Sequence, residues 1–367
     1  MCIVLLTTSH PKYALVVINN RDEFILRPTS KLHWWTTTTD PGPQANGSSS
    51  PSNVEILSSR DLQRAEQGTW HGITKGGNFA VLTNYRETDT HDAAHPVHGQ
   101  RSRGGMVTAW LGAHPSEPTA DFVHRMLDGG DMKHIGGFSL ICGKLRKRKG
   151  RGESSIEPLA IISNRNDCAD DVPWICGGRG EVYGLSNTCY VDADRHTGTK
   201  LWPKVQNGQD MVTAAINTAI REDLKEDELV DALLRILSED TFPHASGMEF
   251  EESIPLLKHS IFIPAFGGTK QKQEMEAAVL NGTDKGAERC AAIKELKTEG
   301  RPDEQANGFM TGLYGTQRQT VLLVDWDGNV RYTERNLWDA QGNPIERGAG
   351  DTTVTFSIEG WNSESES

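Results

Sequence analysis

The second residue of the chain, Cys2, is the first that could do chemistry. The apolar run Ile3–Leu6 follows it directly. Methionine aminopeptidase tends to remove Met1 when a small residue follows, and Cys2 would then carry both a thiol and a free α-amine. An α-amine has an unperturbed pKa of about 7.7–8.0, so near neutral pH it can take the proton of its own thiol. One residue would supply nucleophile and base. The alternative is a small buried hydrophobe at the start of a strand.

A charged pair, Arg21-Asp22, follows the second apolar run, Tyr13–Ile18. An arginine beside a thiol lowers the pKa of that thiol, and an aspartate can accept a hydrogen bond from an α-ammonium group and orient it. Both residue types therefore suit a site built around Cys2. The alternative is a structural ion pair that closes a hairpin.

Two asparagines end further apolar runs. Asn84 follows Ala80–Thr83, and Asn187 follows Tyr183–Ser186. A carboxamide NH2 at the end of a strand is a suitable donor for the oxyanion that forms when a nucleophile attacks an acyl group. The alternative is that each asparagine opens a turn, which is its commonest role in that position.

The elements that must position these residues are strands at both ends of the chain and helices between them. Helical spacing of apolar residues predicts helices over 211–220 and 229–237, and a shorter one after Pro118. The turn Asp327-Gly328 between two β-rich runs predicts a hairpin over 320–333. Strands are predicted over 2–8, 13–18, 79–84, 137–143, 159–163 and 182–187. Strands with amphipathic helices indicate an α+β fold of packed sheets with helices outside.

One large domain is expected over residues 1–360. Residues 38–53 contain Pro41-Gly42-Pro43 and a serine run, and they cannot bury enough apolar surface to become ordered. Residues 270–308 are polar and poor in β-branched side chains. We expect mobile insertions at both ranges and a disordered tail over 361–367.

Composition excludes several classes of function. The net charge of -12 and pI near 5.5 argue against a nucleic-acid partner, because phosphate binding requires a basic face. Six cysteines without C-x-x-C spacing indicate neither a zinc site nor a disulfide framework, so we expect no metal or cofactor. His91, His95 and His98 have helical spacing, but Pro96 and Gly99 favour a solvated loop.

Any membrane contact is expected to be peripheral. No segment approaches the roughly 20 apolar residues of a membrane span. The basic run Lys144–Arg151 is read as a solvated hairpin tip, with a localisation signal or a contact with anionic lipid as alternatives. Cysteine usage favours a reducing, cytoplasmic compartment, and the sequence is silent on oligomeric state.

Several short segments, spread in order over nearly the whole chain, carry a resemblance to a known family. They are Asn20-Arg21-Asp22-Glu23 with Arg27-Pro28-Thr29, Gly68–Ile73, Leu82–Arg86, Ser102-Arg103-Gly104, Tyr183–Asn187, Trp202–Val205, and Tyr314-Gly315-Thr316 with Gln319-Thr320-Val321. In these residues and in this order, the chain closely resembles the NRDE family. So many ordered motifs make the resemblance highly specific.

The resemblance implies a fold and a chemistry. The NRDE family is similar to the N-terminal nucleophile hydrolases, particularly the choloylglycine hydrolase and penicillin V acylase branch, whose four-layer αββα fold packs two mainly antiparallel sheets. In that branch a mature N-terminal Cys is the nucleophile, an Arg and an Asp follow the second strand, and two Asn lie downstream. The matching catalytic positions are Cys2, Arg21, Asp22, Asn84 and Asn187.

This sequence departs from the hydrolase pattern in two places. Intervening residues separate the Arg from the Asp in the hydrolases, whereas Arg21 and Asp22 are adjacent. A further Arg of the hydrolases has only Arg318 as a candidate counterpart.

Two functions of different class follow. The first is hydrolysis of amide or thioester acyl bonds by Cys2. The second is a non-catalytic carrier or regulator that binds acyl-CoA, lipid or haem at the same site. A third possibility, a pure scaffold for Golgi proteins, needs only surface residues and explains the site residues least. The resemblance also implies roles in Golgi organisation, secretion and lipid or haem homeostasis, and association with the Golgi or mitochondria. We expect a small acyl, lipid or haem ligand, with binding contributions from Asn20, Glu23, Tyr85, Arg86 and Arg318.

Overall fold

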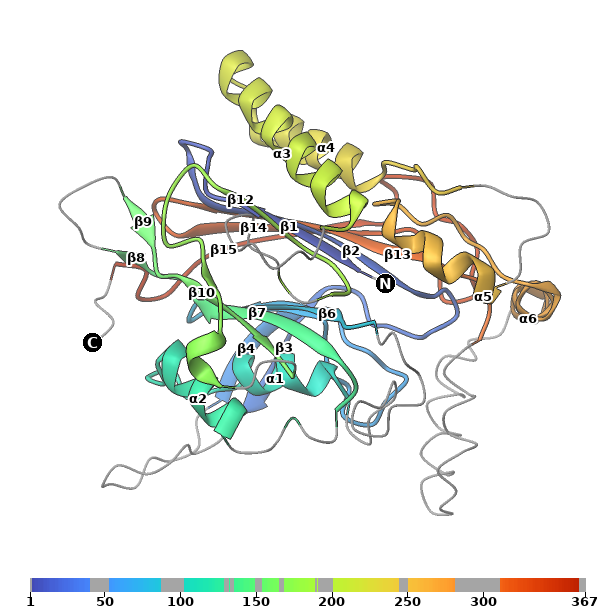
Figure 1. Cartoon of the computed structure of the whole chain (residues 1–367), viewed down its shortest axis with the longest axis horizontal. Coiled ribbons are helices and arrows are strands. Elements are labelled where there is room, and N and C mark those ends of the chain that lie inside the picture. The colour runs from blue at the N-terminus through green and yellow to red at the C-terminus, as the bar shows by residue number, and fades with distance from the viewer. Residues whose placement is uncertain are drawn as a thin grey trace.

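Four layers make up the protein (Figure 1). The computed structural model describes residues 2–39, 53–86, 102–128, 132, 135–148, 154–164, 168–188, 190, 201–243, 250–280 and 311–362. Within these ranges two large antiparallel sheets stack face to face, and a pair of helices covers the outer face of each sheet. The αββα sandwich expected from the resemblance is confirmed.

The first sheet has six strands and contains the start of the chain. Both β1 and β2 are buried along their whole length, apart from the half-buried Glu23. A sheet that is covered on both faces needs such near-continuous apolar runs, which explains why Ile3–Leu6 and Tyr13–Ile18 show no alternation with polar residues. In spatial order the strands are β12 (Val182–Leu185), β1 (Ile3–Thr7), β2 (Tyr13–Phe24), β13 (Tyr314–Asp325), β14 (Asn329–Asn336) and β15 (Asp351–Ser357).

The second sheet has seven strands from the next part of the chain. Its centre, β5, β6 and β7, is buried, and β3 at one edge is largely exposed. In spatial order the strands are β11 (Trp174–Ile175), β10 (Leu159–Ser163), β7 (Phe138–Lys144), β6 (Asn78–Asn84), β5 (His71–Thr74), β4 (Asn53–Ser58) and β3 (His33–Thr38). A separate small hairpin pairs β8 (Lys147–Arg148) with β9 (Ser155–Ile156).

Helices cover the outer face of each sheet. The pair α3 (Pro203–Glu222) and α4 (Glu226–Leu237) covers the six-stranded sheet, and α1 (Gly104–Leu111) with α2 (Thr119–Asp128) covers the seven-stranded sheet (Figure 1). Pro203 occupies the first turn of α3, where its fixed φ suits the helix and its missing N–H costs nothing. The remaining helices are the short η1 (Ala169–Asp171), α5 (Phe250–Ser253) and η2 (Ile254–Lys258), and α6 (Thr269–Leu280).

Alternation along the buried strands divides their side chains between two cores. Ile3 and Leu5 of β1 pack toward α3 and α4, whereas Val4 and Leu6 pack into the core between the sheets. Successive residues of a strand point to opposite faces. The same rule decides which face of β2 presents each of its polar residues.

The elements that periodicity predicted are present. Helices α3, α4 and α2 confirm the three predicted helices, and their apolar stripes are buried. The hairpin β13–β14 is confirmed, and Gly328 in its turn has a φ of 83°, a conformation in the left-handed region that favours glycine. The basic run also contributes β8 to a hairpin, whose tip lies outside the described residues.

The expected insertions and tail differ in part from the structure. Of the 38–53 range, Thr38 belongs to β3, Thr39 is buried and Asn53 begins β4, whereas residues 40–52 lie outside the described residues. Helix α6 occupies the start of the 270–308 range, and the rest of that range is not described. Trp361 is buried because its ring packs over Gly328 at the hairpin turn.

Two other expectations concern features beyond the fold. His91, His95 and His98 lie outside the described residues. None of the helices in the described ranges combines the length and the apolar character that a bilayer crossing needs.

Candidate active site

Cys2 lies at the start of β1, beside the end of β2. The β1–β2 ladder pairs Ile3 with Asn20, so the residue before Ile3 comes next to Arg21 and Asp22. The backbone N–H of Asp22 hydrogen-bonds the Cys2 sulfur. The Cys2 side chain is 7% exposed. The Cys2 thiol and the charged pair Arg21-Asp22 therefore lie next to each other.

Arg21 points into the space between the two sheets. Its guanidinium stacks over the ring of Trp70, 4.2 Å from the ring centroid, and donates a hydrogen bond to Oε1 of Gln317. Gln317 is the extra residue of a β-bulge, because the β13–β2 register shifts between Thr316 and Arg318. The bulge turns the Gln317 carboxamide toward Arg21, while Gln317 Nε2 donates to two backbone carbonyls, those of Ile25 and Arg27. The Arg21 side chain is thus held in a single place.

Asp22 points to the opposite face of the sheet, toward the α3 layer. Its Oδ1 accepts a 2.8 Å hydrogen bond from Thr316 Oγ1, and its carbonyl accepts a 3.0 Å bond from the Tyr314 hydroxyl. Burial raises the pKa of the Asp22 carboxyl, while the chain's amino terminus, Lys204, the Thr316 hydroxyl and Arg21 act in the other direction, in that order. The carboxyl is therefore rigidly held in an apolar layer.

The adjacency of Arg21 and Asp22 has a direct structural result. Neighbouring residues of a strand face opposite sides of the sheet, so the two side chains approach the thiol from different layers. Burial raises the pKa of the Cys2 thiol most, the chain's amino terminus lowers it, the Asp22 carboxylate raises it, and the Asp22 N–H and Arg21 lower it. The resting sulfur is accordingly a thiol that needs a base to ionise it.

Asn187 and Asn84 meet at the junction of the two sheets. Asn187 Nδ2 donates a 2.5 Å hydrogen bond to the Asn84 carbonyl, and Arg86 N–H donates a 3.0 Å bond to the Asn187 carbonyl. Ser186 Oγ donates to the carbonyl of Cys2 at 2.8 Å. A continuous set of hydrogen bonds therefore connects Cys2 through Ser186 and Asn187 to the end of β6.

The two asparagine side chains differ in what they already bind. Asn187 is buried, with one amide hydrogen engaged by Asn84 and its Oδ1 accepting from Ser186. The Asn84 carboxamide is half-buried and makes no hydrogen bond within the described part of the chain. Alternation along β6 gives Asn84 the face of Ala80 and Leu82, which pack toward α1 and α2, whereas Thr83 on the other face donates to the Ser186 carbonyl.

Two residues flanking Arg21 and Asp22 have structural contacts. Asn20 Nδ2 donates to the carbonyls of Leu237 and Ile261, at 2.8 and 2.9 Å, and so ties the end of α4 to the sheet. Glu23 Oε2 forms an ion pair with Arg27 Nη1 at 3.0 Å. Burial by itself would raise the pKa of Glu23, but Arg27 and Arg21 hold it at about 2.

The other expected binding residues surround the same end of the sheets. The Arg318 guanidinium lies 5.8 Å from the ring centroid of Trp70, and it donates hydrogen bonds to Glu334, Ser59 and Thr29. Arg86 Nη1 donates to the Ile254 carbonyl at 2.9 Å. The backbone N–H of Tyr85 donates to the Gly137 carbonyl.

Three residues near Cys2 were not singled out from the sequence. Trp70 and Gln317 hold Arg21. The charge of Lys204 in α3 interacts with the charges of Asp22 and Cys2. Lys204 stands in the Trp202–Val205 motif, so a search for ionisable residues in the motifs could have found it. Gln317 could not be found in this way, because a bulge has no sequence signature of its own here.

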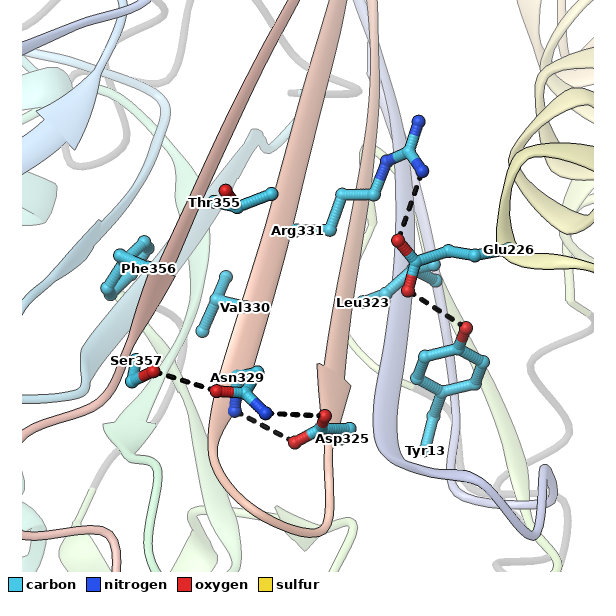
Figure 2. Close-up of a pocket in the computed structure, with 10 residues that line it drawn as sticks. All are labelled: Tyr13, Glu226, Leu323, Asp325, Asn329, Val330, Arg331, Thr355, Phe356 and Ser357. Carbon is cyan, nitrogen blue, oxygen red and sulfur yellow. Dashed lines mark hydrogen bonds and ion pairs between the residues drawn. The ribbon is translucent and has the colours of Figure 1, made fainter.

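A second region with charged residues lies at the opposite end of β2 and β13. Figure 2 shows a pocket of about 300 Å³ whose lining includes Tyr13, Glu226, Asp325 and Arg331. Glu226 accepts hydrogen bonds from the Tyr13 hydroxyl at 3.1 Å and from Arg331 at 3.0 Å. Glu226 and Arg331 form an ion pair, and Asp325 accepts hydrogen bonds from residues of the β13–β14 turn. Among the described residues, no group of three or more His, Cys, Asp or Glu side chains is arranged to hold a metal ion.

Comparison with known sequences identifies the family. The family model described as Transport and Golgi organisation 2 matches residues 1–339. The chain belongs to the Transport and Golgi organisation 2 family. It is 27% identical over 343 residues to the Transport and Golgi organization protein 2 homolog of Bos taurus, covering 92% of this chain and 93% of the bovine protein. The homolog of Homo sapiens is 26% identical over 345 residues, covering 92% and 94%.

Solved structures with a similar arrangement share little sequence with this family member. Penicillin V acylase from Agrobacterium tumefaciens gives a TM-score of 0.33 at 9% identity, covering 97% of this chain and 86% of the acylase. A mutant of conjugated bile acid hydrolase from Clostridium perfringens gives 0.34 at 11% identity, covering 99% and 98%.

Proposed function

We propose that this family member is an N-terminal Cys hydrolase of amide or thioester acyl bonds, with Cys2 as the nucleophile after removal of Met1. The observation that carries the proposal is the convergence at one end of the two sheets. The thiol, Arg21, Asp22 and the Asn187–Asn84 pair come from four separate strands or strand ends. Residues that far apart in the chain meet here around one nucleophile.

In the proposed reaction the Cys2 sulfur attacks the acyl carbon, and its α-amine takes the thiol proton. A carbon–sulfur bond forms, the bond to the leaving amine or thiol breaks, and the α-ammonium returns its proton to the leaving group. Water then hydrolyses the acyl-Cys2 thioester. We assign the oxyanion donors to the Asn187 and Asn84 carboxamides, and one such donor is worth about 2.7–4 kcal/mol in the transition state. The Asp22 carboxylate accepts a hydrogen bond from the α-ammonium group and orients it.

The second candidate is a carrier or regulator that binds an acyl-CoA, lipid or haem ligand at this site without turnover. Burial of Cys2 and the raised pKa of its thiol favour it. Under either reading we propose that the chemistry at this site underlies a role in Golgi organisation, at a cytoplasmic location with at most peripheral membrane contact.

The test begins with the mass of the intact native protein. A mass without Met1 is expected, because the mechanism requires the amine on Cys2. The processed protein is then incubated with acyl-amide and thioester substrates, and the expected result is hydrolysis with a transient acyl adduct on the Cys2 peptide.

Cys2→Ala is expected to abolish turnover and the adduct. Cys168→Ala is the matched control, because Cys168 is an exposed free cysteine, and it is expected to retain full activity. Retention of Met1, or equal turnover by wild type and Cys2→Ala, would contradict the hydrolase. Unchanged ligand binding by Cys2→Ala without turnover in any variant would favour the carrier.

A further inference from the structure

Lys204 is a buried cation that the proposed reaction does not yet use. It is the second residue of α3, and its side chain is 0% exposed. Its Nζ has no hydrogen-bond partner among the described residues. Lysine is almost never fully buried unless it is paired, and burial of an ammonium group costs several kcal/mol.

The position on the helix adds to this cost. The N-terminal end of a helix carries partial positive charge, so a cation in the first turn is destabilising. The ring of Trp202 lies 5.9 Å from Nζ, at the outer limit of a cation–π contact. A lysine that served only to fill space here would be replaced with advantage by an apolar side chain of similar length.

The groups that do compensate the charge belong to the active site. Burial lowers the pKa of Lys204, and the charges that oppose this are Asp22 first and Cys2 second. Asp210, Glu239 and His259 are the other titratable side chains near Lys204, and they line a pocket of about 250 Å³ with it.

Asp22 needs a cation on this face of the sheet. The reaction requires its carboxylate to be ionised when the α-ammonium forms, yet burial favours the neutral acid. Arg21 is held on the opposite face by Trp70 and Gln317. Of the charges that act on Asp22, the chain's amino terminus is the largest and Lys204, from the α3 layer, is the next.

We propose that Lys204 is a positioning residue, whose ammonium holds the Asp22 carboxylate ionised and directed at the amino group of Cys2. This inference rests on the proposed function, but it can be tested without turnover. Loss of the ammonium removes a positive charge near both Asp22 and the thiol, so it disfavours both anions.

The experiment follows alkylation of Cys2 by iodoacetamide as a function of pH, in the full-length processed protein, by mass spectrometry of the Cys2 peptide. In Lys204→Met the alkylation profile is expected to move to higher pH by about one unit. If substrates are turned over, the acid limb of the kcat profile moves in the same direction and KM changes little. Lys204→Gln is the second neutral variant, in case Lys204→Met folds poorly.

The controls separate a positioning role from a structural one. Lys225→Met removes an exposed lysine at the start of α4 and is expected to leave the alkylation profile in place. In an Asp22→Asn background, Lys204→Met is expected to shift the acid limb of the kcat profile no further. Folded Lys204→Met and Lys204→Gln proteins with wild-type alkylation profiles would overturn the proposal, whether or not the protein turns over substrate.

Discussion

The two ends of strands β2 and β13 contrast in how they hold charge. At one end Arg21 and Asp22 are buried in different layers around the Cys2 thiol. At the other end Glu226 and Arg331, 45% and 20% exposed, pair with one another at the pocket in Figure 2. Asp22 lies nine positions after Tyr13 in β2, which is about 30 Å along a strand. The same two strands thus build two different electrostatic environments.

The difference teaches where functional chemistry is expected. Exposed ion pairs such as Arg331 with Glu226 and Asp227 are screened by water and contribute about 0–1 kcal/mol. Buried charges such as Arg21 and Lys204 are costly unless specific partners compensate them. A fold that retains several of them around one thiol carries a cost that stability alone does not explain, and pKa values perturbed in this way are typical of functional sites.

The largest expected difference between the two ends is in catalysis. Asp22→Asn is expected to lower kcat by about 10²–10⁴-fold, because a neutral carboxamide cannot hold the α-ammonium of Cys2. Asp325→Asn is the matched substitution at the other end, where the carboxylate only accepts hydrogen bonds within the β13–β14 turn. Turnover of Asp325→Asn within twofold of wild type is expected in the same assay. Equal losses in both variants would erase the contrast.

The second difference is in stability. Glu334 is 1% exposed and accepts from Arg318, which is 7% exposed. Glu334→Gln leaves the buried Arg318 without its counter-charge and is expected to lower the free energy of unfolding by about 3–5 kcal/mol. Glu226→Gln, in the exposed network, is expected to cost at most about 1 kcal/mol. Urea denaturation measures both, and a Glu334→Gln protein as stable as Glu226→Gln would count against the ranking.

The smallest expected effect is a dependence of stability on pH that comes from His71. Its side chain lies between the sheets against Tyr332 and Phe79, and burial lowers its pKa from 6.5 to about 3. Between these values the unfolded chain binds a proton that the folded protein does not. Stability is therefore lost as the pH falls below 6.5, by about 1.4 kcal/mol per pH unit.

His71→Gln is expected to remove this slope between pH 6.5 and 5, measured as urea midpoints at several pH values. His124→Gln, which changes an exposed imidazole on α2, serves as the control and should keep the wild-type slope. A slope that survives in His71→Gln would show that another group causes it.

Local features of the chain were predictable because their causes are local. The apolar runs that became β1 and β2, the stripes of α3 and α4, and the Asp327-Gly328 turn all depend on residues a few positions apart. Polarity alone was a poorer guide to whether a segment forms a helix. Thr269–Leu280 has few β-branched residues and a weak apolar stripe, yet it forms α6, where Met275 packs against Leu26.

By itself, the sequence determined the residue types of the site: a leading thiol, an adjacent Arg-Asp pair, and two asparagines at the ends of apolar runs. Only the tertiary structure decided how they meet. Arg21 is held by Gln317, 296 residues away, through a bulge in β13, and Asn187 reaches Asn84 across 103 residues. Lys204 faces Asp22 because α3 packs on the sheet face that alternation assigns to that carboxyl. Such contacts depend on sheet order and layer stacking, which short-range periodicity does not encode.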